Sequence, residues 1–283
     1  MSGTLIIPPL PNTLLSIQTL MNQEEPDIPA IAALVKEDIA LYTLFLSAAN
    51  SPWMGLSQPA TSIEHAIMLM GLDRIYTMVQ SMTIRTAFNG CDLKESFWTA
   101  AIDVAGICSD LAHRFSGLDR NLAYSIGMLH NAGIAIMMNH YKIYKNYIKT
   151  HEKLSAPQLC ASERKEFGTD HYLQGALMAK NWCLSEEVIL TIRCQPIAEK
   201  ILTGHKEMSE NVCTYLSILM LAKCVSAEFQ KYWLLIDDDQ TALETRIALD
   251  YLHVNHGDFE ELKEDFFRRI ILLNLLNKSQ ALP

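Results

Sequence analysis

Apolar residues along most of the chain recur at intervals of three and four, which is the spacing of one face of an α-helix. In the segment 93–115, for example, Phe97, Ala101, Val104, Cys108 and Leu111 fall on one such face. The same spacing is present in segments 11–21, 28–35, 39–49, 63–70, 72–87, 122–138, 172–182, 212–229, 243–252 and 259–276. No segment shows the alternation typical of a half-buried strand, so the pattern predicts an all-α protein.

Polar residues at the ends of these segments favour the same interpretation. Ser62, Ser155 and Ser185 each precede a helical pattern, and serine is a preferred N-cap residue. Asn50 follows an apolar segment just before Ser51 and Pro52, where backbone groups lose their helical partners. We therefore expect the Asn50 side chain to bond nearby backbone.

The most apolar stretch, 122–138, carries a histidine and an asparagine side by side in "GMLHNAG". It is shorter than the roughly 20 residues that a membrane span needs, so a buried central helix is expected. Gly127 and Gly133 would let neighbouring helices approach closely. His130 and Asn131 are then expected to be buried, either as hydrogen-bonded core residues or facing a ligand, because an unsatisfied buried polar group costs about 1–3 kcal/mol.

Composition narrows the class of protein. The 283 residues have 49% hydrophobic content and a formal net charge of −9, which argues against direct binding to nucleic acid. The seven cysteines show no zinc-binding spacing, and the N-terminus lacks the features of a secretory signal. We expect a cytoplasmic protein that does not bind a membrane.

The order of several short motifs resembles one family. "PPLPNTLLSIQTLMN", "LSAANSPWMG", "SIEHAIMLMG", "GMLHNAG" and "FGTDHYLQG" are similar to the HDOD domain, the HD-related output domain of bacterial signalling proteins. The resemblance implies an HD-domain-like helical bundle over residues 7–196, with an N-terminal helical subdomain over about 7–90 and an HD-like part over about 91–196. Residues 197–283 are expected to form a C-terminal helical extension that packs on the same core.

HDOD domains are similar to the HD metal-dependent phosphohydrolases, in which a histidine, an adjacent His-Asp pair and a later aspartate hold a divalent metal. The resemblance places Ala100 at the first position, His130 and Asn131 at the pair and Lys223 at the last. A divalent ion would gain roughly 8 kcal/mol from a carboxylate about 4 Å away at an effective dielectric of about 20, and an amide forfeits most of this. The resemblance therefore implies a degenerate pocket with no metal and no catalytic residue.

Several other polar residues could contribute to the pocket, but most are expected to have structural or surface roles. Gln195 stands before Pro196, where many family members have paired histidines. Asp103 could turn toward the pocket but is expected to be a solvated or capping carboxylate. Asp170 and His171 are expected to cap and tether the helix that begins there. His253 and His256 have a metal-compatible spacing on one predicted helix face, but no third ligand is near, so surface positions are expected.

The resemblance implies a standalone bacterial signal-transduction module without a cofactor. Its partner would be an unknown signalling protein or a small ligand, and a homodimer is possible. The alternative is a phosphohydrolase that uses a divalent metal on a nucleotide or cyclic dinucleotide. A module that senses a ligand in the old pocket is a further alternative.

Overall fold

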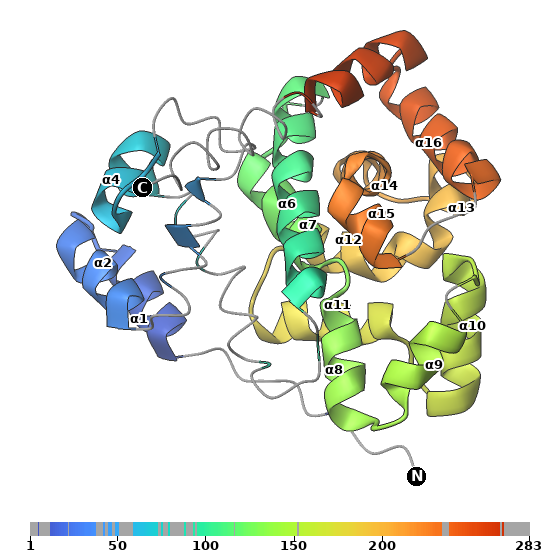
Figure 1. The fold of residues 1–283 in the computed structure, drawn as a ribbon, viewed down its shortest axis with the longest axis horizontal. Helices are drawn as coiled ribbons and strands as arrows, with labels where there is room; N and C mark the ends of the chain where they lie inside the picture. The colour runs from blue at the N-terminus through green and yellow to red at the C-terminus, as the bar shows by residue number, and fades with distance from the viewer. Residues whose placement is uncertain are drawn as a thin grey trace, which may run out of the picture.

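The computed structural model describes residues 12–21, 23–37, 59–72, 95–115, 117–151, 153–233 and 238–266, together with a few isolated positions outside these ranges. The described residues form α-helices and one 3₁₀ helix, and no strand is found among them (Figure 1). The prediction of an all-α protein is therefore confirmed. Most of predicted segments 39–49 and 72–87, and the end of 259–276, lie outside the described residues.

The helices fall into two groups along the chain (Figure 1). The N-terminal group packs α2 against both α1 and α4. Its members are α1 (Asn12–Met21), α2 (Ile28–Glu37) and α4 (Ile63–Met70). The second group contains α6 (Glu95–Phe115), α7 (Arg120–Leu129), α8 (Ala132–His140), α9 (Tyr144–Thr150), α10 (Ala156–Phe167), α11 (His171–Asn181), α12 (Glu186–Cys194), η2 (Gln195–Ile197), α13 (Ala198–Leu202), α14 (Glu210–Val225), α15 (Ala227–Trp233) and α16 (Asp238–Leu252).

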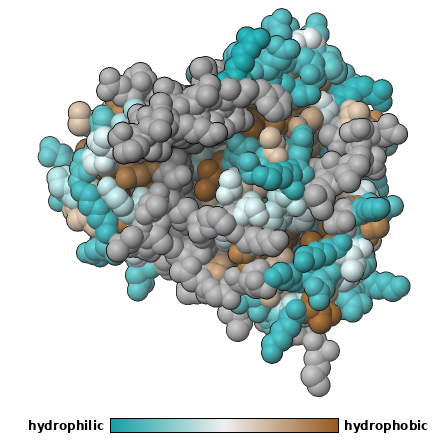
Figure 2. All heavy atoms as spheres, in the orientation of Figure 1, coloured by the Kyte–Doolittle hydropathy of each residue, from teal (hydrophilic) through white to brown (hydrophobic). Residues whose placement is uncertain are grey.

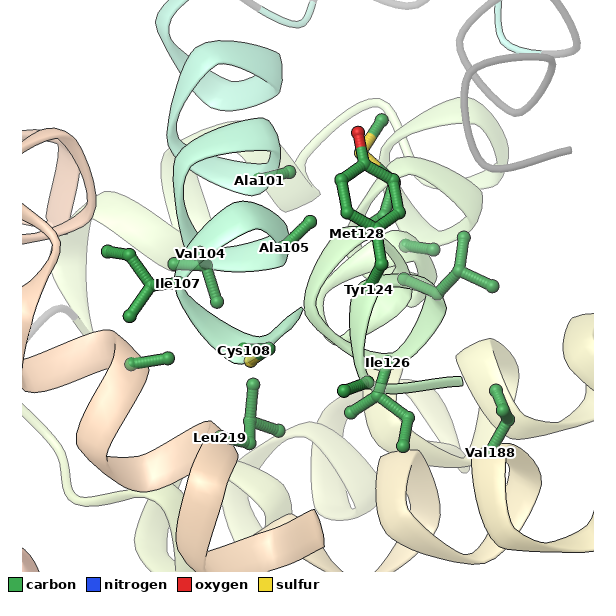
Figure 3. Packing of buried hydrophobic residues seen from close by; sticks show 14 of the residues in the cluster. Ala101, Val104, Ala105, Ile107, Cys108, Tyr124, Ile126, Met128, Val188 and Leu219 are labelled. Atoms are coloured by element: carbon green, nitrogen blue, oxygen red, sulfur yellow. The ribbon is translucent and has the colours of Figure 1, made fainter. Parts of the chain in front are cut away.

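Helix α6 is the centre of the second group. It packs against α7, α14 and α15, and its apolar face is fully buried at Val104, Ala105 and Cys108. Figure 3 shows these side chains in one apolar cluster with Tyr124 of α7 and Leu219 of α14. The same cluster extends to Phe266, so the C-terminal helices share the core of the preceding ones. In the view of Figure 2, hydrophilic residues lie along much of the outer edge of this part, with some hydrophobic residues exposed among them.

Two glycines allow close contact between helices, as the sequence predicted. A Cβ atom on Gly127 would lie 2.5 Å from Ala105 Cα, so α7 meets the backbone of α6 at this point. A Cβ atom on Gly133 would overlap the His171 carbonyl oxygen, which brings α8 equally close to α11. Only glycine, which has no Cβ, permits backbones to approach this closely.

Two predicted helices are interrupted. The expected single helix over 122–138 is wrong: α7 ends at Leu129 and α8 begins at Ala132. The expected single helix over 212–229 is also wrong, because α14 and α15 meet at Ser226 with a bend of 77°. The Ser226 hydroxyl accepts the Phe229 N–H at 3.1 Å, which favours a new helix start over continuation of α14.

Local start signals in the sequence are confirmed. Ser62 accepts the His65 N–H and Ser185 accepts the Val188 N–H, while Ser155 forms a capping box with Gln158. The Asn50 side chain bonds backbone as expected. Its Nδ2 donates to the Ala60 carbonyl at 3.0 Å, and its Oδ1 accepts the Ala60 N–H at 2.6 Å.

No single helix in the described ranges has the length and apolar composition to cross a membrane. The bent pair α14 and α15 meets that requirement by length and composition alone. Most of α14 is buried in the core of the protein.

The two bonds of Asn50 predict a graded loss of stability. Asn50→Ala leaves both Ala60 backbone groups without their partner and should lower the free energy of unfolding by about 1 kcal/mol or more. Asn50→Asp keeps the acceptor for the Ala60 N–H and should lose less. Urea denaturation of the three proteins measures the order; an alanine variant as stable as wild type would show that these bonds do not stabilise the fold.

The contact at Gly127 predicts a packing defect. Gly127→Ala pushes a methyl group into the backbone of Ala105 and should cost about 1–3 kcal/mol of unfolding free energy. Gly257→Ala is the control, because a Cβ there would meet only Asn255 Oδ1 at 3.4 Å. Thermal and urea unfolding should separate the two variants, and equal losses would contradict the proposed packing.

Candidate functional site

His130 lies at the break between α7 and α8, buried to 2% exposure. Its Nδ1 is 2.6 Å from the Gly127 carbonyl oxygen, and a carbonyl can only accept, so Nδ1 carries the proton. This bond satisfies a carbonyl in the last turn of α7. Nε2 is then a buried acceptor, and no described residue bonds it.

The pKa of His130 keeps its ring neutral. Burial, which is the larger cause, and the nearby Lys223 ammonium together lower the pKa from the ordinary 6.5 to about 3, although the hydrogen bond to Gly127 acts in the opposite direction. A neutral imidazole beside a cation has a free lone pair on Nε2, but its surroundings are electrostatically unfavourable for a second cation.

Gln195 connects this histidine to Lys223. Gln195 Nε2 donates to the His130 carbonyl at 2.8 Å and to the Ile192 carbonyl at 3.2 Å. Gln195 Oε1 accepts from Lys223 Nζ at 3.2 Å. The amide thereby joins η2, the α7–α8 break and α14 through one buried side chain. The Lys223 side chain therefore points toward the residues around His130.

Phe229 covers the same pocket. Its ring centroid is 5.5 Å from that of His130, and Lys223 Nζ lies 5.8 Å from it. Burial lowers the pKa of Lys223, since desolvation disfavours the ammonium, while Glu244 acts in the opposite direction. Burial likewise raises the pKa of the Cys108 thiol, so this cysteine is a neutral neighbour of the lysine.

The other two positions implied by the resemblance supply no charge. Ala100 is buried at 2% exposure in α6 and offers only a methyl group. Asn131 is the N-cap of α8, but its side chain makes no capping bond. The expectation that both members of the pair are buried holds for His130 only, because Asn131 is half-buried where the chain turns between two helices.

Asp103 has a structural contact. Its Oδ2 accepts the Ser226 hydroxyl at 2.5 Å, and this serine separates α14 from α15. The carboxylate thus connects α6 to the 77° bend between α14 and α15.

Asp170 caps α11, as predicted, and accepts the Leu173 N–H at 2.8 Å. It also accepts Arg164 Nε at 2.7 Å and faces Arg193 Nη1 at 3.6 Å. Burial raises the pKa of the Asp170 carboxyl, but the Leu173 N–H and the two guanidinium groups outweigh it and hold the pKa below the ordinary 3.8. Asp170 is therefore a charged anchor for two arginines.

Among the residues that the structure describes, His171 is one of two that bind the buried Glu163 carboxylate, where three helices meet. Its Nδ1 lies 2.8 Å from Glu163 Oε1, and its backbone N–H donates to Glu163 Oε2 at 3.0 Å. The Tyr144 hydroxyl donates to the same carboxylate, which is completely buried. α9, α10 and α11 are thus joined at Glu163, in agreement with the expected tethering role of His171.

The residues of this pocket do not fit a divalent metal. His130 Nε2 is the one ligand of the family pattern that remains, beside a neutral amide and an ammonium group. Among the described residues, no three His, Cys, Asp or Glu side chains are grouped so that they could hold an ion. The electrostatics at Lys223 would oppose such an ion.

The prediction for His253 and His256 is partly wrong. Both are exposed, as expected, but they do not share a helix. His253 has a φ of 54° just after α16, and His256 begins the next helical segment. A change of helix direction between them removes the predicted common face.

Sequence reasoning missed several residues of the site region. Glu163 and Arg164 belong to the charged segment "SERKEF", whose composition is typical of a solvated face. Phe229 looked like the last apolar residue of one long helix. The N-cap preference of Asp170 gave no signal that Arg193 would reach it from another helix.

The depressed pKa of His130 predicts a pH dependence of stability. Below the ordinary pKa of 6.5 the unfolded chain takes up a proton that the folded chain refuses until about pH 3. Unfolding free energy should therefore fall with decreasing pH in this window, by up to about 1.4 kcal/mol per pH unit from this group.

Replacement of the histidine isolates this effect. His130→Asn should have lower stability at neutral pH but a shallower pH slope below about 6. The exposed His256→Asn serves as the control for removal of a histidine. Urea unfolding at a series of pH values measures the slopes, and a His130→Asn slope equal to that of wild type would show that His130 takes up its proton in the folded state.

Comparisons with known proteins place the chain in a family and give its fold. A curated relative, an uncharacterized protein of Treponema pallidum, is 29% identical over 192 residues. The match covers 66% of this chain but 37% of that protein, so the chain spans a little over a third of its relative.

Solved structures share the fold. A provisionally named phosphohydrolase from Shewanella amazonensis has a TM-score of 0.67 at 21% identity, covering 93% of this chain and 91% of that one. An HDOD domain protein of unknown function from Geobacter sulfurreducens has a TM-score of 0.64 at 20% identity, covering 93% and 91%. A provisionally named signal transduction protein from Marinobacter aquaeolei has a TM-score of 0.64 at 20% identity, covering 93% of this chain and 57% of that one.

The family assignment comes from the sequence itself. Residues 7–197 match the model of the HDOD domain, which is more than half of the chain. The chain therefore belongs to the HDOD domain family.

Proposed function

We propose that this protein is a bacterial regulatory module that acts in the cytoplasm, through contacts with a signalling protein or a small ligand rather than by phosphate hydrolysis. Membership of the HDOD family and the name of the Marinobacter aquaeolei neighbour support a role in signal transduction. The observation that carries the proposal is the chain of contacts from His130 through Gln195 to Lys223.

An ammonium group takes part in this chain where the family pattern has a metal-binding carboxylate. Metal-assisted hydrolysis needs ligands that hold the ion and leave a position for the attacking water. A site with one imidazole nitrogen, an amide and a half-buried lysine supplies neither the negative charge nor the number of ligands that the ion needs. The phosphohydrolase alternative requires the metal ligands that this site lacks. The name of the Shewanella amazonensis neighbour is therefore not transferred to this chain.

The pocket retains the means to recognise a neutral or anionic group. His130 Nε2 is an acceptor without a partner among the described residues, and Lys223 is a donor with three N–H groups. Ring contacts with Phe229 restrict the space around both. These features support a role in recognition or in fixing the surface that a partner contacts.

A metal titration tests the proposal. Calorimetry with Mg²⁺, Mn²⁺ and Zn²⁺ should show no one-to-one submicromolar binding, and nucleotides and phosphodiesters should not be hydrolysed with these ions added. Asn131→Asp should not create activity, because one carboxylate and one imidazole leave the coordination sphere incomplete. Tight binding that His130→Ala abolishes would overturn the proposal in favour of the phosphohydrolase.

A combined variant is the matched positive control. Ala100→His, Asn131→Asp and Lys223→Asp together restore the ligand types of the family pattern and remove the opposing charge. This variant should bind Mn²⁺ or Zn²⁺ more tightly than the wild-type chain if it folds, which circular dichroism checks. Equal affinity in both proteins would show that the ligand substitutions are not what prevents metal binding.

A further inference from the structure

A separate cavity lies on the outer side of the second helical group, between α10, the α12–η2 turn and the loop after α13. Its volume is about 340 Å³, which is within the range of about 300–1,000 Å³ usual for small-molecule sites. Figure 1 shows α10 and α13 as neighbours at the edge of the fold. The cavity shares none of the contacts of His130 and Lys223.

The charge of this cavity is opposite to that of the whole protein. Three cationic side chains, Arg164, Arg193 and Lys206, line it, and no carboxylate does. The chain as a whole has a formal net charge of −9, so three cations around one small cavity are not a consequence of composition.

Asp170 organises two of these cations from behind. Its fully buried carboxylate accepts Arg164 Nε at 2.7 Å and faces Arg193 Nη1 at 3.6 Å. Asp170 neutralises one of the three positive charges, and Glu163 also acts electrostatically on Arg164, so the cavity lining keeps an excess of positive charge. A phosphate monoester carries about −1.5 to −2 charges near pH 7, and guanidinium groups match the geometry of its oxygens.

The third cation, Lys206, lies in a loop that a backbone hydrogen bond holds in place. Lys206 N–H donates to the Lys200 carbonyl at 3.1 Å, which closes the loop after α13. The Lys206 ammonium has no hydrogen bond or ion pair to any residue that the structure describes. It is therefore available to an anion in the cavity.

The remaining lining is apolar. Pro157 and Ala161 come from α10, and Ile197 comes from η2. An inorganic ion would leave these apolar surfaces exposed to water. A compact organic group would cover them, and the removal of apolar surface from water would add to its binding free energy. The preferred ligand should thus have a dianionic head and a small apolar body.

We propose that this basic cavity binds a small organic phosphate. Arg164, Arg193 and Lys206 would contact the phosphate group, and the apolar residues Pro157 and Ala161 would contact the organic group. This inference goes beyond the proposed function and does not depend on the state of the His130 pocket.

Titration calorimetry of the full chain at low salt tests the site with phenyl phosphate, inorganic phosphate and benzoate as probes. Phenyl phosphate should bind most tightly, because inorganic phosphate lacks the apolar body and benzoate has a single charge. Lys206→Gln and Arg193→Gln should each weaken phenyl phosphate binding about tenfold. Ala161→Trp, at an exposed position in the lining, should abolish it by filling the cavity without changing charge.

The matched control is Lys200→Gln, which removes one exposed positive charge near the cavity but not in its lining. It should leave the affinity within about twofold of wild type.

Three results would overturn the proposal. They are no binding of phenyl phosphate up to about 10 mM, equal weakening by Lys206→Gln and Lys200→Gln, and binding that Ala161→Trp leaves intact. Backbone amide shifts in an NMR titration, expected at Ala161, Arg164 and Ile197, locate the bound probe independently of the heat signal.

Discussion

The helical segment 122–138 is broken at His130, and the packing of the second helical group depends on this break. Gly127 of α7, before the break, packs against α6, and Gly133 of α8, after it, packs against α11. The break costs backbone bonds, and the bond between His130 Nδ1 and the Gly127 carbonyl replaces one of them. The imidazole is therefore a structural cap as well as part of the pocket.

The residues around His130 form a buried hydrogen-bonded arrangement. Gln195 bonds the His130 carbonyl with its amide N–H and Lys223 with its oxygen, so both ends of the side chain are satisfied. Phe229 adds ring contacts to both neighbours. Three segments that are distant in sequence meet here, and the hydrogen bonds of Gln195 that join them involve no carboxylate. The arrangement is compatible with recognition, and its charge is unsuitable for an ion.

One short turn separates this pocket from the basic cavity. Cys194 and Pro196 line the cavity, while Gln195 between them reaches His130 on the other side. The two regions therefore share backbone but not side chains. A ligand in the basic cavity would contact the same turn that places Gln195 beside His130.

The sequence by itself determined the helical class and several of the helix starts. Helix spacing and helix caps depend on a few neighbouring residues, so a single segment of sequence is enough to predict them. This applies to the caps at Ser62, Ser155, Ser185 and Asp170 and to the bonding of Asn50. The absence of charge at Ala100 and Asn131 is likewise a matter of residue identity.

Only the tertiary structure decided where the helices break and which charges meet. The breaks at His130 and Ser226 arise from contacts with α6 and α11, which no periodicity within 122–138 or 212–229 encodes. Glu163 is buried because Tyr144 and His171 reach it from other helices, although its own segment is typical of a solvated face. Arg164, Arg193 and Lys206 gather around one cavity for the same reason: their proximity depends on the packing of three segments, and packing is a property of the whole chain.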